Sequence, residues 1–212
     1  CSHMTIRRDI ALLEQEGRAY SVTGGVRIAS QLHSEPSHQI KAVVELPQKQ
    51  AMAKLAARLL HADMTIYLDA GTSTLEIVPH IKALSGMTVV TNDFGIVQAL
   101  IDAPHVTVIH TGGQLDHSNQ SCVGGLAVAT LRQVVTDIAF ISTSSWDLRR
   151  GLTTPSALKV EVKQVAMQSA AQVVLVASSS KYGTFSMYRI AGLEQFDIIL
   201  SDDALTPAAA DS

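Results

Sequence analysis

The chain has 212 residues, of which 47% are hydrophobic and 17% charged, a balance that excludes an intrinsically disordered protein. The formal net charge of −3 argues against a chain that is basic throughout and leaves room for a small basic region. No run approaches about 18 apolar residues and no signal peptide is visible, so the sequence predicts a cytoplasmic protein with no membrane partner. Cys1 and Cys122 are too few and too far apart to indicate a disulfide framework, and the histidines lack metal-ligand spacing. We therefore assign no metal and no cofactor.

A short amphipathic helix is predicted at the start of the chain. Ile6, Ile10 and Leu13 recur at the spacing of one helix face. Ser2 stands at the position of an N-cap, and Gly17 stands where a glycine commonly ends a helix.

Two different segments follow this helix. Residues 18–29 predict two short strands around the turn "TGG", because Gly24 and Gly25 can adopt positive φ. Residues 30–46 are polar at first, contain a proline and lack a clear period, which predicts a linker.

From Pro47 onward the sequence alternates between helix and strand patterns. Helices are expected at 48–60, 71–84 (after an opening loop), 94–102, 125–135 and 156–170, and strands at 64–70, 87–93, 105–113, 137–143, 172–180 and 196–203. Strands separated by single helices indicate right-handed βαβ units. The predicted fold class is α/β, an open, mostly parallel sheet with helices on both faces. Residues 206–212 are expected to form a frayed tail.

The candidate site lies where these strands end, because ligands of open α/β sheets bind beyond the carboxyl ends of the strands. Residues 69–74, "DAGTST", place Thr72, Ser73 and Thr74 beside amides at a helix start, and Gly71 frees the backbone. This combination suits a phosphate or carboxylate, although an ordinary helix cap is the alternative. Further polar segments follow the other strands: Thr91-Asn92-Asp93, Gly112-Gly113, residues 142–156 and the segment "SSSKYG" with Lys181. Together they predict a polar pocket suited to a sugar phosphate.

Two lysines of the predicted helix 156–170 are harder to place. Lys159 and Lys163 lie one turn apart and share a helix face. A solvent-exposed face is the simpler interpretation for Lys159, and spacing alone leaves open whether Lys163 faces the pocket.

Motifs along nearly the whole chain resemble the DeoR family of bacterial transcription repressors. "TIRRDIALLEQEG" followed by "TGGV" resembles the recognition helix and wing of that family's winged helix-turn-helix. The sensor-domain motifs appear in order: Lys49, "LDAGTST", "VTND", "TGG", "VGG", "DIAFIST", "GLTTPS", "VKQVAM", "SSSKYG" and "FDIILSD". The resemblance implies a truncated winged helix-turn-helix over residues 1–29, a linker over 30–46 and an effector-binding sensor domain over 47–205.

The resemblance implies DNA contacts near the start of the chain. The two helices that support the family's recognition helix are missing from this sequence, so operator DNA is expected as a partner of the full-length protein only. Thr5, Arg7 and Arg8 would face DNA, with one arginine reading a guanine edge and the other a phosphate. Which arginine does which stays open.

The resemblance also implies a fold shared with ribose-5-phosphate isomerase and a phosphorylated sugar, or a breakdown product of one, as effector. The contacts that it carries over by position are Gly71, Thr72, Ser73, Thr74, Asn92, Gly112, Gly113, Gly124, Thr153, Thr154, Lys163 and Lys181. Asp69, Thr91, Trp146 and Asp147 complete the candidate set, because they follow strands or fall in the "STSSWD" loop. Trp146 could stack on a sugar, although a core or interface tryptophan is the more common case. Ser178 stands where the family usually has aspartate, which leaves the identity of the effector open.

Two functions are weighed on this basis. The first is an effector-controlled repressor of a carbohydrate-metabolism operon, at least a dimer because operators match protein symmetry. The second is a sugar-phosphate isomerase or hydrolase, which would need a positioned acid–base pair. Asp69 and Asp147 are candidates for such a pair, but no His or Glu joins the loops. The repressor is the favoured interpretation and no enzymatic activity is expected.

Overall fold

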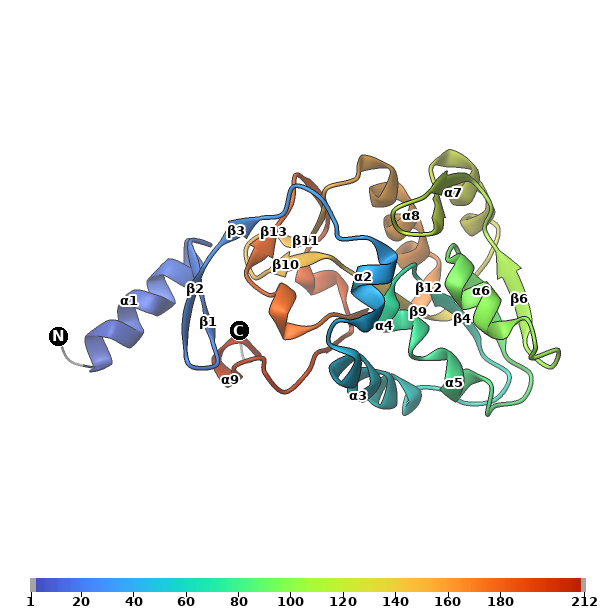
Figure 1. The fold of residues 1–212 in the computed structure, drawn as a ribbon, viewed down its shortest axis with the longest axis horizontal. Helices are drawn as coiled ribbons and strands as arrows, with labels where there is room; N and C mark the ends of the chain where they lie inside the picture. The colour runs from blue at the N-terminus through green and yellow to red at the C-terminus, as the bar shows by residue number, and fades with distance from the viewer. Residues whose placement is uncertain (1–2, 211–212) are drawn as a thin grey trace.

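The computed structural model describes residues 3–210 (Figure 1). The predicted N-cap Ser2, Cys1 and the last two residues of the predicted tail lie outside the described residues. No helix within residues 3–210 has the length and apolar character needed to cross a membrane.

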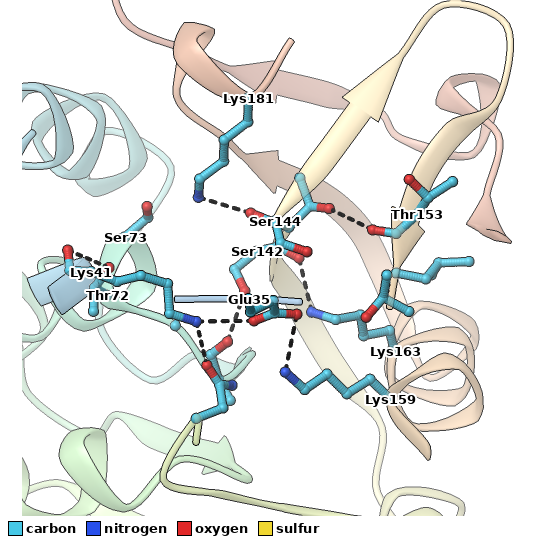
Figure 2. Close-up of a pocket in the computed structure, with 16 residues that line it drawn as sticks. Glu35, Lys41, Thr72, Ser73, Ser142, Ser144, Thr153, Lys159, Lys163 and Lys181 are labelled. Atoms are coloured by element: carbon cyan, nitrogen blue, oxygen red, sulfur yellow. Dashed lines mark hydrogen bonds and ion pairs between the residues drawn. The ribbon is translucent and has the colours of Figure 1, made fainter. Parts of the chain in front are cut away.

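The centre of the molecule is a six-stranded parallel sheet with the order β15-β12-β9-β4-β5-β6. Its strands are β4 (Thr65–Leu68), β5 (Thr88–Thr91), β6 (Thr107–His110), β9 (Thr136–Ser142), β12 (Ala170–Val176) and β15 (Ile198–Leu200). The chain builds β4, β5 and β6 outward on one side and then β9, β12 and β15 outward on the other. The strand order therefore reverses between β4 and β9, and the ends of these two strands bring Thr72 and Ser142 to one edge (Figure 2). The predicted α/β fold class and parallel sheet are confirmed.

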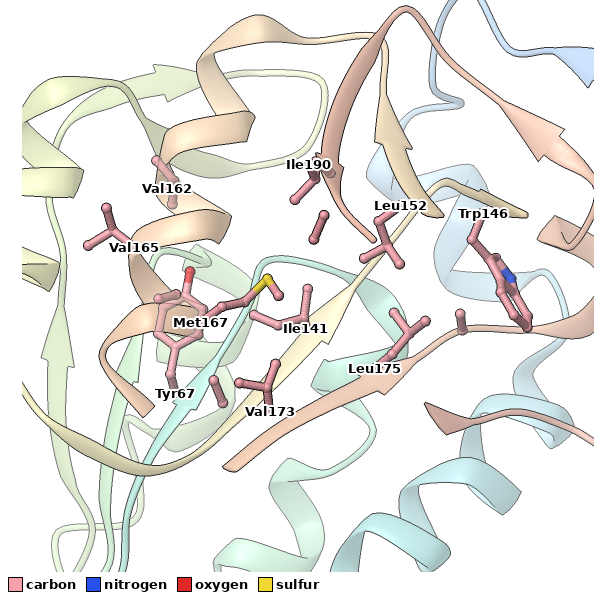
Figure 3. Packing of buried hydrophobic residues seen from close by; sticks show 14 of the residues in the cluster. Tyr67, Ile141, Trp146, Leu152, Val162, Val165, Met167, Val173, Leu175 and Ile190 are labelled. Atoms are coloured by element: carbon pink, nitrogen blue, oxygen red, sulfur yellow. The ribbon is translucent and has the colours of Figure 1, made fainter. Parts of the chain in front are cut away.

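Helices cover both faces of this sheet, as expected for a parallel sheet. They are α3 (Leu46–Ala57), α4 (Thr72–Leu75), α5 (Val78–Ile81), α6 (Phe94–Leu100), α7 (Gly125–Leu131) and α8 (Ala157–Gln168). Alternate residues of β4 point to opposite faces. Ile66 and Leu68 pack in a cluster with α3, α5 and α6, whereas Tyr67 packs in a second cluster with α7 and α8. The second cluster extends along this face of the sheet, from Met167 of α8 to Trp146 (Figure 3).

A second, antiparallel sheet borders the carboxyl end of the central one, and its strands were not predicted. It contains β10 (Ser145–Asp147), β11 (Gly151–Thr154) and β14 (Tyr188–Ala191). A hairpin of β7 (Gln114–Asp116) and β8 (Ser121–Val123) was also missed, as were β13 (Thr184–Phe185) and the 3-10 turns η1 (Ser179–Lys181) and η2 (Leu193–Gln195). These strands have only two to four residues each, too few to show a strand pattern, so their pairing depends on tertiary neighbours.

Three further predictions need correction. The helix expected at 71–84 is split into α4 and α5, with Pro79 in the first turn of α5, where the missing amide proton costs no helical bond. The predicted linker contains β3 (Ser30–Gln31) and the helix α2 (His38–Val43), capped by Ser37, whose hydroxyl accepts a hydrogen bond from the Ile40 amide. The predicted tail contains α9 (Pro207–Ala210).

The N-terminal elements follow the prediction. Helix α1 (His3–Gln15) ends before Gly17, which has φ +66°, and β1 (Ala19–Val22) pairs with β2 (Gly25–Ile28). Only Gly24 of the turn pair has positive φ. Helix α1 projects from the body and is mostly exposed, whereas the hairpin is docked through buried Tyr20 (Figure 1). The Tyr20 ring meets the edge of the Tyr182 ring at 5.1 Å between centroids.

Candidate functional site

A polar pocket lies where the ends of β4 and β9 meet the small sheet. Its lining comes from segments far apart in the chain: Glu35, Lys41, Ala70, Gly71, Thr72, Ser73, Asn119, Ser142, Thr143, Ser144, Thr153, Thr154, Lys159, Lys163, Lys181 and Ile190 (Figure 2). A smaller cavity that shares Lys159 and Lys163 with it is also lined by Asp69 and Asn92. The pocket therefore occupies the predicted edge of the sheet, at the switch in strand order.

A buried ion pair forms the floor of the site. Asp69 pairs with the Lys163 ammonium and accepts hydrogen bonds from the amide and hydroxyl of Ser142 at 2.9 and 2.8 Å. Lys163 also donates to the Ser142 carbonyl at 2.8 Å. Because each charge has several partners, this pair holds the ends of β4 and β9 together. The question about Lys163 is answered, since it faces the pocket.

The "GTST" loop is fixed by the next strand. The Gly71 amide donates to Asp93 at 3.1 Å, and the Ala70 amide donates to the Asn92 side-chain oxygen at 3.0 Å. A Cβ on Gly71 would lie 2.7 Å from the Ser142 hydroxyl, so only glycine fits there. Burial, together with the nearby Asp69 charge, raises the pKa of Asp93 to about 6, although amide donors oppose this shift.

The hydroxyls of the loop have different surroundings. Thr74 donates to the carbonyls of its own loop, Asp69 at 2.6 Å or Gly71 at 2.7 Å, and therefore stabilises the turn. The Thr72 hydroxyl is 3.4 Å from the Lys41 carbonyl. Ser73 is only 2% exposed, lines the pocket, and its hydroxyl has no hydrogen-bond partner within the described part of the chain. Because buried polar groups are ordinarily hydrogen-bonded, this hydroxyl is free to bond to a further group in the pocket.

Four lysines surround the pocket. Lys181 donates to the Thr143 carbonyl at 2.8 Å, and burial with the charges of Lys41 and Lys49 lowers its pKa to about 8. Lys159, expected at the surface, is 7% exposed and pairs with Glu35 at 3.1 Å. That expectation is wrong because Glu35 and the β7–β8 hairpin cover this face of α8. Asp116 of the hairpin lies 3.4 Å from the Lys159 ammonium.

Glu35, Lys41 and Asn119 line the pocket but were not predicted from the sequence, whereas Ser144 belongs to the predicted polar segment 142–156. Glu35 and Lys41 belong to the segment predicted as a linker, whose aperiodic polar sequence resembles surface loops. Asn119 lies in the missed β7–β8 turn and accepts a hydrogen bond from Lys41 at 2.6 Å. The proline and the polar composition favoured a linker, although Ser37 could have indicated the start of α2 as an N-cap.

The predicted contact residues are only partly brought together. The pocket is lined by Gly71, Thr72, Ser73, Thr153, Thr154, Lys163 and Lys181, and the smaller cavity by Asp69, Asn92 and Lys163. Neither cavity is lined by Thr74, Thr91, Gly112, Gly113, Gly124, Trp146 or Asp147.

Several predicted contact residues that lie outside both cavities bond to the protein itself or shape its backbone. The Thr91 hydroxyl donates to the Leu68 carbonyl at 2.7 Å. Gly112, Gly113 and Gly124 have positive φ, and a Cβ on Gly113 would lie 2.8 Å from the Val123 carbonyl, so they shape the backbone.

The placement of Trp146 and Asp147 near a ligand is corrected. Trp146 is 2% exposed in the core, 4.9 Å from the Tyr182 ring, and its Nε1 donates to the Ser178 carbonyl at 3.4 Å. Asp147 is buried and pairs with Arg150 at 2.7 Å. Successive residues of a strand face opposite sides, and in β10 both sides are covered: Trp146 packs in the hydrophobic core and Asp147 is buried against Arg150.

The predicted DNA-contacting residues lie apart from the pocket. Thr5, Arg7 and Arg8 are exposed on α1, which extends from the β1–β2 hairpin away from the central sheet (Figure 1).

The chemistry available in the pocket is that of anion binding. The carboxylate of the pocket, Glu35, is paired with Lys41 and Lys159, and Asp69 of the adjoining smaller cavity is paired with Lys163. Neither residues 3–210 as a whole nor this pocket groups three His, Cys, Asp or Glu side chains in a way that could hold a metal ion.

Comparison with known proteins agrees with this architecture. The sequence profile described as the DeoR C terminal sensor domain matches residues 44–203. The chain belongs to the DeoR family. It is 46% identical over 209 residues to the HTH-type transcriptional regulator YgbI of Escherichia coli K12, covering 99% of this chain and 82% of that protein. It is 31% identical over 204 residues to the HTH-type transcriptional regulator GlpR of Haloferax volcanii, covering 96% of this chain and 80% of that protein.

The fold of the chain is similar to that of a solved structure at low sequence identity. The δ subunit of eIF2B from Chaetomium thermophilum superposes with a TM-score of 0.54 at 13% identity, over 76% of this DeoR-family chain and 58% of that one. Ribose 5-phosphate isomerase A from Methanocaldococcus jannaschii superposes with a TM-score of 0.45 at 15% identity, over 63% of this chain and 53% of that one.

Proposed function

We propose that this DeoR-family transcriptional regulator represses a carbohydrate-metabolism operon and is controlled by a phosphorylated sugar bound in the pocket. The observation that carries the proposal is the excess of lysine in a largely buried polar site. Lys41, Lys159, Lys163 and Lys181 line the pocket. Three carboxylates oppose them, Glu35, Asp69 and, from outside the pocket, Asp116.

This charge balance favours an anionic ligand. Four lysines against three carboxylates leave one positive charge without a partner, and Lys181 has only a neutral carbonyl among its hydrogen-bond partners. A phosphate beside Lys181 would gain charge-assisted hydrogen bonds, and the open Ser73 hydroxyl offers a further donor. The threonine and serine hydroxyls of the lining suit the hydroxyls of a sugar.

The N-terminal elements support the DNA-binding half of the proposal. Arg7 and Arg8 are exposed on α1, and the hairpin that carries α1 is docked on the sensor domain through Tyr20. In the cytoplasmic protein bound to its operator, residues 1–29 would supply the recognition helix and wing. Residues 47–205 would form the effector-binding domain and at least a homodimer, because paired recognition helices read paired half-sites.

The proposal is tested by calorimetric titration of this chain with phosphorylated sugars, the matching free sugars and inorganic phosphate. Phosphorylated sugars should bind with micromolar or tighter dissociation constants, and the free sugars more weakly by about 10-fold or more, as one charge-assisted hydrogen bond implies. The same ligands should change operator binding by the full-length protein. Equal affinity for phosphorylated and free sugars would contradict the proposal, as would turnover of any ligand into a product.

A further inference from the structure

The segment between β3 and α2, residues 32–37, crosses the pocket as a strap. One end is held by the Leu32 amide, which donates to the Phe185 carbonyl at 2.7 Å, and the other by the His38 amide, which donates to the Ser118 carbonyl at 2.9 Å. Between these anchors, Glu35 reaches into the pocket with a side chain that is 11% exposed. In Figure 2 its carboxylate lies between Lys41 and Lys159.

The two carboxylate oxygens of Glu35 are divided between the two lysines. One oxygen is 3.0 Å from the Lys41 ammonium and the other is 3.1 Å from the Lys159 ammonium. Burial opposes ionisation of this carboxyl, but the two lysines outweigh burial and lower its pKa to about 2. Glu35 is therefore a carboxylate at neutral pH, held where a ligand could place an anionic group.

Departure of Glu35 would leave neither lysine isolated. Lys41 also donates to the Asn119 side-chain oxygen at 2.6 Å, and Lys159 is also 3.4 Å from Asp116. Asp69 differs, since it is tied to both Lys163 and Ser142 at the junction of two central strands. Of the two carboxylates, Glu35 can leave at a lower cost than Asp69, because Lys41 and Lys159 each keep a second partner.

The pocket thus has two cationic ends. Lys181 approaches from the side opposite Lys159 in Figure 2, and its ammonium has no carboxylate partner among the described hydrogen bonds and ion pairs. The buried hydroxyl of Ser73 also lacks a partner within residues 3–210. This end is open to an anion, whereas the end between Lys41 and Lys159 already holds one.

We propose that Glu35 is a built-in carboxylate occupying a second anion subsite, and that the effector is a phosphorylated sugar acid whose own carboxylate displaces it. The proposal rests on the proposed function, with the phosphate at the Lys181 end. A ligand carboxylate can accept hydrogen bonds from Lys41 and Lys159 as Glu35 does, so the exchange retains both charge-assisted contacts. A terminal hydroxymethyl group cannot make this exchange, because it brings no charge to the two lysines.

Displacement has a direct route to the N-terminal elements. The strap follows β3, which pairs with β13 and is joined through Ala29 to the hairpin that carries α1. A ligand that expels Glu35 removes the strap's ionic contacts and shifts the population of strap positions. The amides of Leu32 and His38 then exchange faster with solvent, which reports displacement independently of affinity.

The test compares matched ligand pairs by calorimetry on this chain and its Glu35→Gln variant. Each pair is a phosphorylated aldonic acid of four, five or six carbons and the alditol phosphate of the same length, which differ only in carboxylate against hydroxymethyl. The control variant is Glu161→Gln, which removes an exposed carboxylate paired with Arg132 at the surface. Circular dichroism and melting temperature establish that each variant is folded.

For at least one chain length, the wild type should bind the acid more tightly than the alditol phosphate. Glu35→Gln should tighten binding of the acid by about 10-fold, because the ligand no longer competes with an internal carboxylate, and alter alditol phosphate binding by less than about 3-fold. Glu161→Gln should change neither. In the wild type, the acid but not the alditol phosphate should accelerate hydrogen exchange at Leu32 and His38.

Two other outcomes overturn the proposal in distinguishable ways. If phosphorylated ligands bind but Glu35→Gln changes both members of each pair equally, or weakens the acid, Glu35 is not displaced and the proposed function stands. If no phosphorylated ligand of either class binds the folded wild type or variant, both proposals fail.

Discussion

Replacing Lys181 with methionine removes the positive charge from the open end of the pocket while keeping most of the side-chain volume. The ammonium has three N–H donors, and one of them donates to the Thr143 carbonyl at 2.8 Å, which leaves two for a ligand. One charge-assisted hydrogen bond contributes about 1.5–3 kcal/mol net. Lys181→Met should therefore weaken a phosphorylated sugar by about 10- to 100-fold.

Calorimetry with a phosphorylated sugar and its free counterpart measures this loss. The free sugar should bind weakly to both proteins and change little. Lys54→Met, at an exposed position on α3, is the matched control and should leave both affinities unchanged. Because the pKa of Lys181 is about 8, its charged fraction falls from about nine-tenths at pH 7 to about one-tenth at pH 9. Affinity of the wild type should fall across that range, and affinity of Lys181→Met should not.

Equal losses for phosphorylated and free sugar in Lys181→Met would refute this reasoning, since the lysine would then support the fold and not contact the phosphate. An unchanged affinity for the phosphorylated sugar would refute it differently, by placing the anion elsewhere. A melting temperature close to that of the wild type separates either result from simple unfolding.

Four further outcomes are expected. Thr72→Val, which removes one neutral hydroxyl from the lining, should weaken the phosphorylated sugar by about 2- to 10-fold in the same calorimetric assay; a loss larger than that of Lys181→Met would contradict the assignment of the phosphate to Lys181. Asp69→Asn leaves the buried Lys163 without its carboxylate and should destabilise the chain by about 3–5 kcal/mol, seen as a lower denaturation midpoint in urea; an unchanged midpoint would show that Ser142 alone satisfies the lysine. Light scattering should show at least a dimer at tens of micromolar protein, and operator affinity of the full-length protein should fall steeply as salt rises; a monomer, or binding insensitive to salt, would contradict these two expectations.

The alternation of strand and helix patterns after Pro47 was sufficient to predict the central sheet. Buried strands such as β4 and β5 have apolar central residues, and helices between the strands impose parallel pairing, so the α/β class follows from local patterns. Parallel strands that end at a common edge also place "GTST", Asn92 and Lys181 in one region. That part of the site follows from chain order alone.

Other residues of the site depend on contacts that no local pattern encodes. Glu35 and Lys41 lie in an aperiodic polar segment, and only its anchoring to Phe185 and Ser118 brings them over the pocket. Lys159 has the sequence context of a surface lysine, and its burial results from Glu35 and the β7–β8 hairpin packing on α8.

The sequence by itself determined the parallel sheet, the family and the edge where the polar loops meet, because periodicity and motif order are local properties of the chain. Only the tertiary structure decided which side chains face the pocket. Trp146 and Asp147 follow β9 in sequence, yet pairing of the unpredicted β10 with β11 buries both of them, Trp146 in the core and Asp147 against Arg150. A side chain's direction changes with a one-residue shift in strand register, and long-range pairing sets that register.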